Sequence, residues 1–167
     1  MKLLLSLLIM LSFVHAYEDD LTPKEAYEMQ KEKKAIIVDV RTTLEFIYTG
    51  HGEGFINIPA YEWTYVPKSL ETRVNSADYE ISNSKVKDHK STMKLYDAKE
   101  VINKDFVRDV MSAMKMQGVD KVILVCRSGP RSTAAADILE QAGITAYNLE
   151  DGFIQGWKKS NLPWNGE

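Results

Sequence analysis

The sequence predicts an α/β protein with a central parallel sheet and helices on both faces. Two observations support this prediction. Short apolar runs rich in Val, Ile and Leu, which are typical of strands buried on both faces, occur at 35–40 and 122–125. Segments with helix caps or helical spacing separate the predicted strands, and parallel strands need such crossovers. With 167 residues, 44% of them hydrophobic, the chain is long enough for one domain with its own core.

The N-terminal segment differs from the rest of the chain. After a short basic start, residues 3–14 are almost wholly apolar, and Val14-His15-Ala16 places small residues where a signal peptidase cleaves. We therefore expect a secretory signal peptide at 1–16 and an exported mature domain at 17–167, with the bacterial periplasm as the default location. The apolar run is shorter than the ~20 residues that span a bilayer, and an uncleaved N-terminal anchor is the alternative.

Composition indicates which kinds of partner and cofactor are not expected. Cleavage removes one basic residue, Lys2, and leaves 20 Lys and Arg against 24 Asp and Glu, a net charge of −4. No basic stripe with interleaved aromatic residues occurs, so we expect no nucleic-acid partner and, after cleavage, no membrane association. The two histidines and one cysteine of the mature chain match no metal-site spacing. We therefore expect neither a metal nor another cofactor.

Caps and apolar runs place the elements of the N-terminal half. The sequence Thr22-Pro23-Lys24-Glu25 combines an N-cap, a first-turn proline and a capping box, and predicts a helix to about Lys33. A buried strand is expected at 35–40, and Thr42 or Thr43 then caps a short helix. A glycine-rich turn precedes another short strand at 55–58.

Periodicity places the elements of the C-terminal half. Residues 104–117 predict an amphipathic helix that ends at Gly118 in a left-handed cap. A strand at 145–149 and a turn of helix at 152–159, with Trp157 packed inward, complete the domain. The expected apolar face of the 104–117 helix consists of Phe106, Val107, Val110, Met111 and Met114.

The stretch 121–139 carries the chemistry. An apolar run at 122–125 predicts a strand, a small-residue segment at 132–139 predicts a helix, and the six residues 126–131 between them hold the only cysteine, Cys126. A strand that turns sharply into a helix points its loop amides and the helix N-terminus toward one spot, which makes an anion cradle. A thiol in such a cradle, flanked by two arginines, is expected to be a reactive thiolate.

Four segments resemble the successive signatures of a single-domain rhodanese. They are IVDVRTTLEF (37–46), GHGEGFINIP (50–59), ILVCRSGPRS (123–132) and LEDGFIQGWK (149–158). The resemblance implies a rhodanese-like fold and a catalytic Cys126 that carries sulfur as a persulfide. The expected enzyme is a sulfurtransferase that moves a sulfane sulfur from thiosulfate or polysulfide to a thiophilic acceptor, possible acceptors including a protein. In the first of these segments, Asp39, Arg41 and Glu45 are expected to form a structural ion-pair set.

The loop itself indicates how a persulfide is held. Backbone N–H groups can surround the charged outer sulfur, much as an oxyanion hole holds oxygen. Gly129 lets the backbone fold tightly, whereas Pro130 has no N–H and leaves the cradle one donor short. The residues expected to bind substrate are Arg127, Ser128, Gly129, Arg131 and Ser132.

Loop length argues against a phosphatase. Protein-tyrosine phosphatases place arginine six residues after the cysteine, whereas Arg131 follows Cys126 by five. The shorter loop fits a single sulfur atom better than a phosphate. A persulfide carrier without free turnover and an idle rhodanese-like module that binds a partner both stay open; the intact cysteine loop argues against the idle module.

A long, polar segment at 61–103 interrupts the alternation of predicted strands and helices. Aromatic residues are spread through it, and its middle is locally basic. Long connections in compact domains are often lids or binding loops. We expect this extended insert to cover part of the active-site mouth or to form a self-association surface, with a solvated surface excursion as the alternative.

Overall fold

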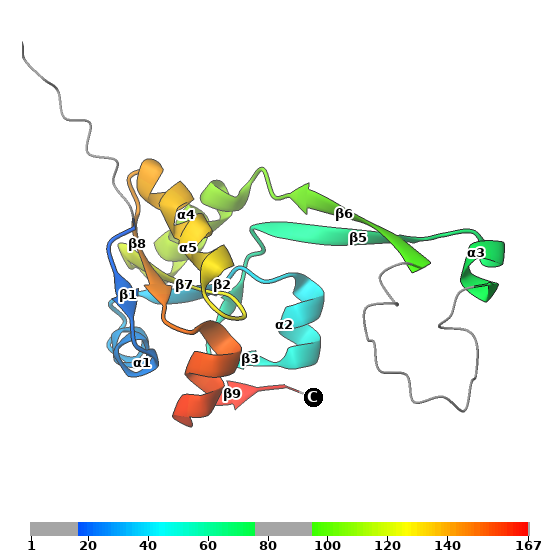
Figure 1. The fold of residues 1–167 in the computed structure, drawn as a ribbon. Coiled ribbons are helices and arrows are strands. Elements are labelled where there is room, and N and C mark those ends of the chain that lie inside the picture. Colours follow the sequence, from blue (N-terminus) through cyan, green and yellow to red (C-terminus); the bar gives the residue numbers. More distant parts are fainter. Residues whose placement is uncertain (1–16, 76–94, 167) are drawn as a thin grey trace, which may run out of the picture.

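The fold is that of a computed structural model, which describes residues 17–75 and 95–166. Five parallel strands form the central sheet, in the order β1-β8-β7-β2-β4 (Figure 1). The strands are β1 (Asp20–Leu21), β2 (Ile36–Asp39), β4 (Ile56–Asn57), β7 (Lys121–Val125) and β8 (Thr145–Leu149). The predicted signal peptide and residues 76–94 lie outside the described ranges, so the cleavage site stays a prediction.

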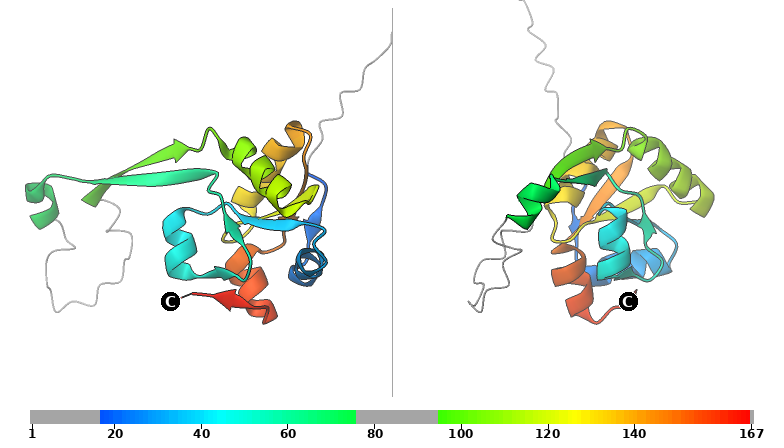
Figure 2. Two further views of the ribbon diagram at one scale, coloured as in Figure 1. Left: turned by 180° about the vertical axis from the view of Figure 1, so that it is seen from behind. Right: turned by 90° about the vertical axis from the view of Figure 1, so that its right-hand side faces the viewer.

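Helices cover both faces of the sheet, as predicted (Figure 2). Because side chains alternate along a strand, Ile36 and Val38 of β2 pack toward one face while Ile37 packs toward the other. The first face is covered by α4 (Phe106–Gln117) and α5 (Pro130–Gln141), and the second by α1 (Pro23–Lys31) and the π-helix η2 (Gly152–Trp157). Within the described ranges, no helix has the length and apolar composition of a membrane span.

Local chemistry explains most element boundaries. The capping box of Thr22 and Glu25 is present at the start of α1, and Thr42 with Glu45 forms a second one before α2 (Thr43–Thr49). Gly118 ends α4 in the left-handed conformation. Trp157 is fully buried, as predicted, and its indole N–H donates to the carbonyl of Pro163.

Three details differ from the prediction. Helix α5 begins at Pro130 instead of Ser132, because proline suits the first helical turn. Met111, expected in the core, is 54% exposed, and the small Ala113 is buried in the same helix. The two-residue strands β1 and β9 (Trp164–Asn165) are not predicted, because they are too short to show a periodic pattern. Strand β9 pairs with β3 (His51–Gly52).

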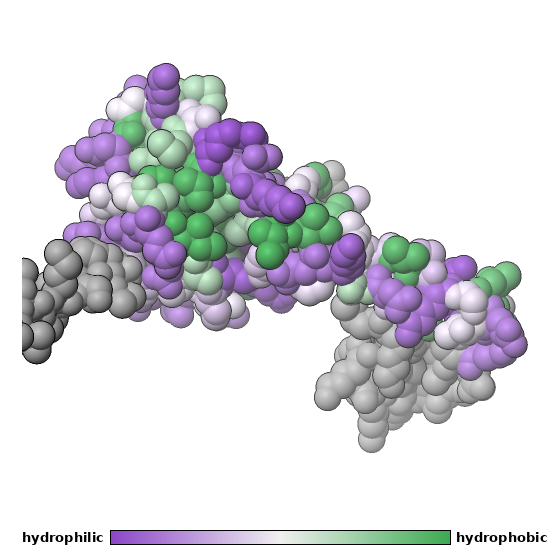
Figure 3. All heavy atoms as spheres, turned by 90° about the horizontal axis from the view of Figure 1, so that it is seen from above, coloured by the Kyte–Doolittle hydropathy of each residue, from purple (hydrophilic) through white to green (hydrophobic). Residues whose placement is uncertain are grey.

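The expected insert begins and ends with a two-stranded antiparallel ribbon. It consists of β5 (Tyr61–Pro67) and β6 (Tyr96–Ile102), with α3 (Leu70–Val74) at its far end, and projects away from the sheet (Figure 1). Seen from above, hydrophobic residues are exposed near the base of the ribbon and toward its far end (Figure 3). The sequence assigns no strand to this polar segment, so the ribbon adds to the predicted elements.

Candidate active site

Cys126 lies at the carboxyl end of β7, the middle strand of the sheet. Open α/β sheets bind their ligands at this end of the strands. Only residues 126–129 separate β7 from α5, and Gly129, at φ 112°, makes the turn in a conformation that few other residues adopt. Pro130 is in the first turn of α5, where a missing N–H leaves no helical hydrogen bond unmade.

The Cys126 thiol is buried and surrounded by hydrogen-bond donors. The residue is 1% exposed, and the Gly129 N–H donates to its Sγ over 3.1 Å. Burial raises the pKa of the thiol. The Ser132 side chain and the amides of Ser128, Ser132 and Gly129 outweigh burial and hold the pKa of the thiol below its ordinary value. Loop dipoles therefore take much of the thiolate-stabilising role that was expected of the two arginines.

The π-helix η2 holds this loop in shape. The Phe153 N–H donates to the carbonyl of Cys126 over 2.8 Å, and the Ile154 N–H donates to that of Arg127 over 3.2 Å. With its carbonyls tied to η2, the loop can present its amides to the sulfur. Gly152 makes this contact possible: its φ is 61°, and a Cβ there would lie 2.6–2.7 Å from backbone atoms of residues 126–128.

Ser132 joins the thiol to a buried polar chain. Its hydroxyl donates to Asn148 Oδ1 at 2.6 Å and contacts the Gly129 carbonyl at 2.8 Å. The Asn148 amide in turn donates to Asp20 Oδ1 over 2.7 Å. Ser132 is fully buried, and its expected contact with substrate stays a prediction. Sequence reasoning missed Asn148, although a polar residue inside a buried strand is itself a signal.

Ser132→Ala is expected to raise the pKa of the Cys126 thiol, because the variant loses the buried hydroxyl that helps to lower this pKa. The rate of alkylation by iodoacetamide, followed against pH, measures this pKa. Thr133→Ala is the matched control, since its hydroxyl also reaches the Gly129 carbonyl, at 3.3 Å, but not the thiol. Equal midpoints for wild type and Ser132→Ala would contradict the assigned role.

The two arginines of the loop have different surroundings. Arg131 forms a two-pronged ion pair with Glu45, with both N–O distances at 2.7 Å. Burial raises the pKa of Glu45, but Arg131 and the Thr42 donors outweigh it and lower that pKa. Arg127 is exposed and has no ion-pair partner within the described part of the chain. Arg131 is thus held in place and partly neutralised, whereas Arg127 is an open positive charge beside the thiol.

The expected ion-pair set is split in two. Asp39 and Arg41 pair as predicted, with an N–O distance of 2.6 Å and almost no exposure. Arg41 also donates to the Gly50 carbonyl over 2.8 Å, which joins the end of β2 to the turn after α2. Glu45 is not part of this pair, because Arg131, 86 residues away in sequence, occupies it. The expectation is therefore corrected for Glu45, which both caps α2 and positions a loop arginine.

A cavity of about 460 Å³ lies in front of the loop. Its lining comes from the start of α2, from the cysteine loop and from β5, and consists of Thr42, Glu45, Tyr61, Trp63, Tyr65, Arg127 and Arg131. The charges of Arg131 and Cys126 act on the Tyr61 phenol, so this wall is close to the thiol. The first strand of the 61–103 segment thus lines this pocket, and its expected role at an active-site mouth stays a prediction.

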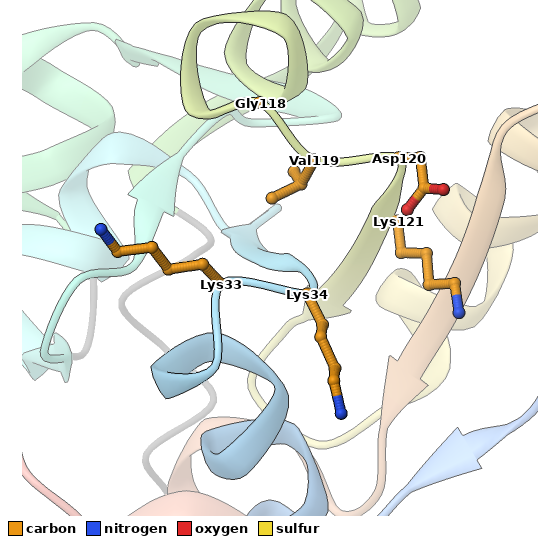
Figure 4. A pocket seen from close by; sticks show the side chains of 6 residues that line it. All are labelled: Lys33, Lys34, Gly118, Val119, Asp120 and Lys121. Carbon is orange, nitrogen blue, oxygen red and sulfur yellow. The ribbon is translucent and has the colours of Figure 1, made fainter.

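A second hollow, of about 590 Å³, lies at the opposite end of the sheet. It is lined by residues just before β2 and at the start of β7, among them Lys33, Lys34 and Lys121. The Lys33 side chain points away from those of Lys34 and Lys121, which run side by side without meeting at one point (Figure 4). Because its polar groups do not converge and it is remote from Cys126, this hollow is not the candidate site.

Comparison with known proteins identifies the family of the chain. The rhodanese-like domain family matches residues 22–160. Uncharacterized proteins of Rickettsia conorii and Rickettsia prowazekii are 38% and 36% identical over 69 residues, which cover 38% of this chain and 56% of each relative. The match thus spans about half the length of these curated relatives.

Solved structures share the fold. A crystal structure of an M. tuberculosis protein superimposes with a TM-score of 0.57 at 25% identity, over 90% of this chain and 98% of that one. Thiosulfate sulfurtransferase from Pseudomonas aeruginosa gives 0.53 at 17% identity, over 90% and 20% of the two chains. The polysulfide-sulfur transferase homodimer of Wolinella succinogenes gives 0.50 at 17%, over 90% and 80%. With the family matching most of its length, this chain belongs to the rhodanese-like family.

Proposed function

We propose that this protein is a sulfurtransferase that takes up a sulfane sulfur on Cys126 and passes it to a thiophilic acceptor. One observation supports this most strongly: a free thiol whose pKa is lowered by donors from its own loop. Two proteins of similar fold are named for the transfer of sulfur from thiosulfate or polysulfide, which supports the same donors here. Among the described residues, no group of His, Cys, Asp and Glu is placed to bind a metal.

In the proposed first step, the Cys126 thiolate attacks the outer sulfur of the donor. With thiosulfate, the S–S bond of the donor breaks, its electron pair leaves with sulfite, and the enzyme keeps a persulfide anion. In the second step, an acceptor thiolate or cyanide attacks the outer sulfur, and the Cys126 thiolate is the leaving group. Both steps conserve charge and need no external oxidant. In this proposal the loop amides and Arg127 stabilise the anionic sulfur, which the Gly129 N–H to Sγ contact and the position of Arg127 in the pocket lining support.

Incubation of the purified protein with thiosulfate or polysulfide is expected to add the mass of one sulfur atom. Mass spectrometry of the intact protein measures the gain, and Cys126→Ser is the control, which is expected to gain nothing. Release of the sulfur to cyanide or a small thiol over many cycles indicates an enzyme, whereas loading without release to small acceptors indicates a carrier for a partner protein. Failure to gain sulfur from any donor would contradict both functions and favour a binding module.

A further inference from the structure

The β5–β6 ribbon has an open edge along β6. Within the described ranges, β6 pairs with β5 alone, and all 7 of its residues are exposed. The ribbon projects away from the central sheet in each view (Figure 1, Figure 2). A two-stranded ribbon is marginally stable by itself, and an exposed edge strand is a template for pairing with another chain. A further strand along this edge would therefore stabilise the ribbon.

Two backbone hydrogen bonds, just beyond the two ends of β6, show which of its groups face outward. The Lys68 N–H donates to the Leu95 carbonyl, and the Asn103 N–H donates to that of Ala60. Hydrogen-bonded and non-hydrogen-bonded pairs alternate in an antiparallel ladder, so the odd-numbered residues of β6 bond to β5. The even-numbered residues of β6 therefore point their N–H and C=O groups to the open edge.

The side chains along β6 are self-complementary in an antiparallel arrangement. One face of the ribbon carries, in the order apolar, acidic, basic and apolar, the residues Leu95, Asp97, Lys99 and Val101. In an antiparallel pair of β6 strands centred on Ala98, Asp97 faces Lys99 of the second copy, and the two-fold symmetry repeats this pair. Leu95 faces Val101 of the second copy in the same arrangement. The small Ala98 meets its own copy at the axis, where bulk would be least tolerated.

The two charged residues are placed to form this pair. In the arrangement centred on Ala98, the even-numbered residues exchange the new hydrogen bonds, so Asp97 and Lys99 form a non-hydrogen-bonded pair. Side chains approach each other most closely at such positions, and opposite charges there stabilise a sheet. The Asp97 side chain is 73% exposed, and its ion pair with Lys68 of its own ribbon is long, at 3.9 Å. Its carboxylate is therefore open to a second cation.

Other registers of the same strand pair bring like charges together. Moving the centre by one residue toward the N-terminus places Asp97 against Asp97 of the second copy. Moving it by one residue in the other direction places Lys99 against Lys99, and a further step places Glu100 against Glu100. Charged residues on an edge strand commonly prevent pairing, whereas their alternation in β6 selects one register.

The open edge of β5 lacks this pattern. Glu62 is the only charged residue of the strand, so no opposite charge of a second β5 could face it. Its carboxylate already accepts hydrogen bonds from the backbone N–H and the hydroxyl of Thr43, over 2.8 and 2.6 Å. Pro67, at the end of the strand, has no N–H to donate. The charge pattern and the free backbone groups thus favour β6 as the pairing edge.

We infer that β6 pairs with β6 of a second copy of this chain, so that two ribbons form one antiparallel sheet in the order β5-β6-β6-β5. The two-fold axis passes through Ala98, perpendicular to this sheet, and two Asp97–Lys99 pairs flank it. Such an axis keeps the same face of both ribbons on one side, so the aromatic side chains of β5 from both copies share a face. The dimer does not depend on the proposed sulfur transfer.

The first test exchanges the two charges and measures the dimer dissociation constant by sedimentation equilibrium. Asp97→Lys and Lys99→Asp are each expected to raise this constant about tenfold or more, because each turns two favourable pairs into two repulsions. The double variant Asp97→Lys/Lys99→Asp restores opposite charges in both pairs and is expected to associate nearly as tightly as the wild type. Its net charge equals that of the wild type, so a general charge effect cannot explain the recovery.

Asp120→Lys is the matched control, because it makes the same change of charge as Asp97→Lys at an exposed residue that precedes β7, outside the ribbon. It is expected to leave the dissociation constant unchanged. A wild-type protein that stays monomeric at every concentration would overturn the inference. A dimer that the single variants do not weaken, or that the double variant does not restore, would overturn it as well.

The second test measures the register directly. Asp97→Cys and Lys99→Cys proteins, each in a Cys126→Ser background that removes the only natural cysteine, are mixed and treated with oxidised glutathione. In the proposed register the two new thiols face each other, with Cα atoms about 4.5 Å apart, and a disulfide spans that distance. The mixture is therefore expected to form a disulfide-linked dimer, which non-reducing electrophoresis detects.

Each cysteine variant alone is the control for this cross-link. Two copies of the same variant place their thiols at diagonal positions about 7–8 Å apart, which is too far for an unstrained disulfide. Either protein alone is thus expected to cross-link about tenfold more slowly than the mixture. Equal rates in the mixture and in the single proteins, or no cross-link in the mixture, would show that β6 does not pair in this register and would sink the inference.

Discussion

Gly152→Ala is expected to slow persulfide formation on Cys126 about 100-fold and to destabilise the fold. A non-glycine residue at φ 61° costs about 1–2 kcal/mol in itself. The added Cβ would also lie 2.7 Å from the Cys126 carbonyl oxygen and 2.6 Å from the Ser128 nitrogen, which are backbone atoms that cannot swing away. The cysteine loop must therefore shift, and a displacement of about 1 Å at a reacting group can cost 100-fold in rate.

Gly143→Ala is the matched control for this variant. Gly143 also has a positive φ, of 77°, but a Cβ there meets nothing within 4 Å. Both variants are expected to lose folding stability, by at least the conformational cost of a positive φ, and urea denaturation measures this loss. Only Gly152→Ala is expected to lose sulfur loading, which single-turnover mass spectrometry measures. Wild-type loading by Gly152→Ala, or the same loading defect in Gly143→Ala, would show that η2 does not hold the loop.

Arg41→Ala is expected to lower the free energy of unfolding by about 3–5 kcal/mol, because it leaves the Asp39 carboxylate buried without its partner. The lost contacts also include the Gly50 carbonyl and the ring of Phe153, which lies 4.5 Å from the guanidinium. Urea denaturation measures the loss. Arg108→Ala, which breaks exposed pairs with Asp105 and Asp109, is the control and is expected to leave the free energy of unfolding nearly unchanged.

The pH dependence of Arg41→Ala is a further part of this prediction. Burial raises the pKa of Asp39, and Arg41 opposes that rise. Without Arg41, the pKa of the Asp39 carboxyl is therefore expected to be higher in the variant than in the wild type. The native state then binds a proton more tightly than the unfolded state. The deficit in stability relative to wild type is expected to be smallest in acid and to grow as pH rises through the raised pKa. A deficit that does not change with pH would show that Asp39 stays ionised without Arg41.

The sheet and most of its helices are predictable because their signals are local. The apolar run of β7 is what a strand buried on both faces requires, and the two capping boxes need only residues three positions apart. The same local chemistry indicates Cys126 as the reactive residue. Element ends are less certain: Pro130 was expected in the loop, although its missing N–H suits a first helical turn.

The ribbon shows where local patterns are insufficient. The order Tyr-Glu-Trp-Thr-Tyr at 61–65 alternates aromatic and polar residues, which is the pattern of a half-exposed strand. The polarity of the whole segment conceals this pattern, and the partner strand begins at Tyr96, far along the chain. Pairing at that separation depends on tertiary structure, since either strand alone has no partner for its backbone groups.

The sequence by itself determined the sheet, the position of the reactive cysteine and the family resemblance, because each depends on neighbours in the chain. Only the tertiary structure decided what acts on that cysteine. Gly152 lets η2 pack against the loop, Asn148 of β8 contacts Ser132 of α5, and Glu45 pairs with Arg131 from 86 residues away. In the same way, the aromatic side chains of β5 line the pocket next to the loop arginines. These contacts arise from packing between segments that are distant in the sequence, so short-range sequence patterns do not predict them.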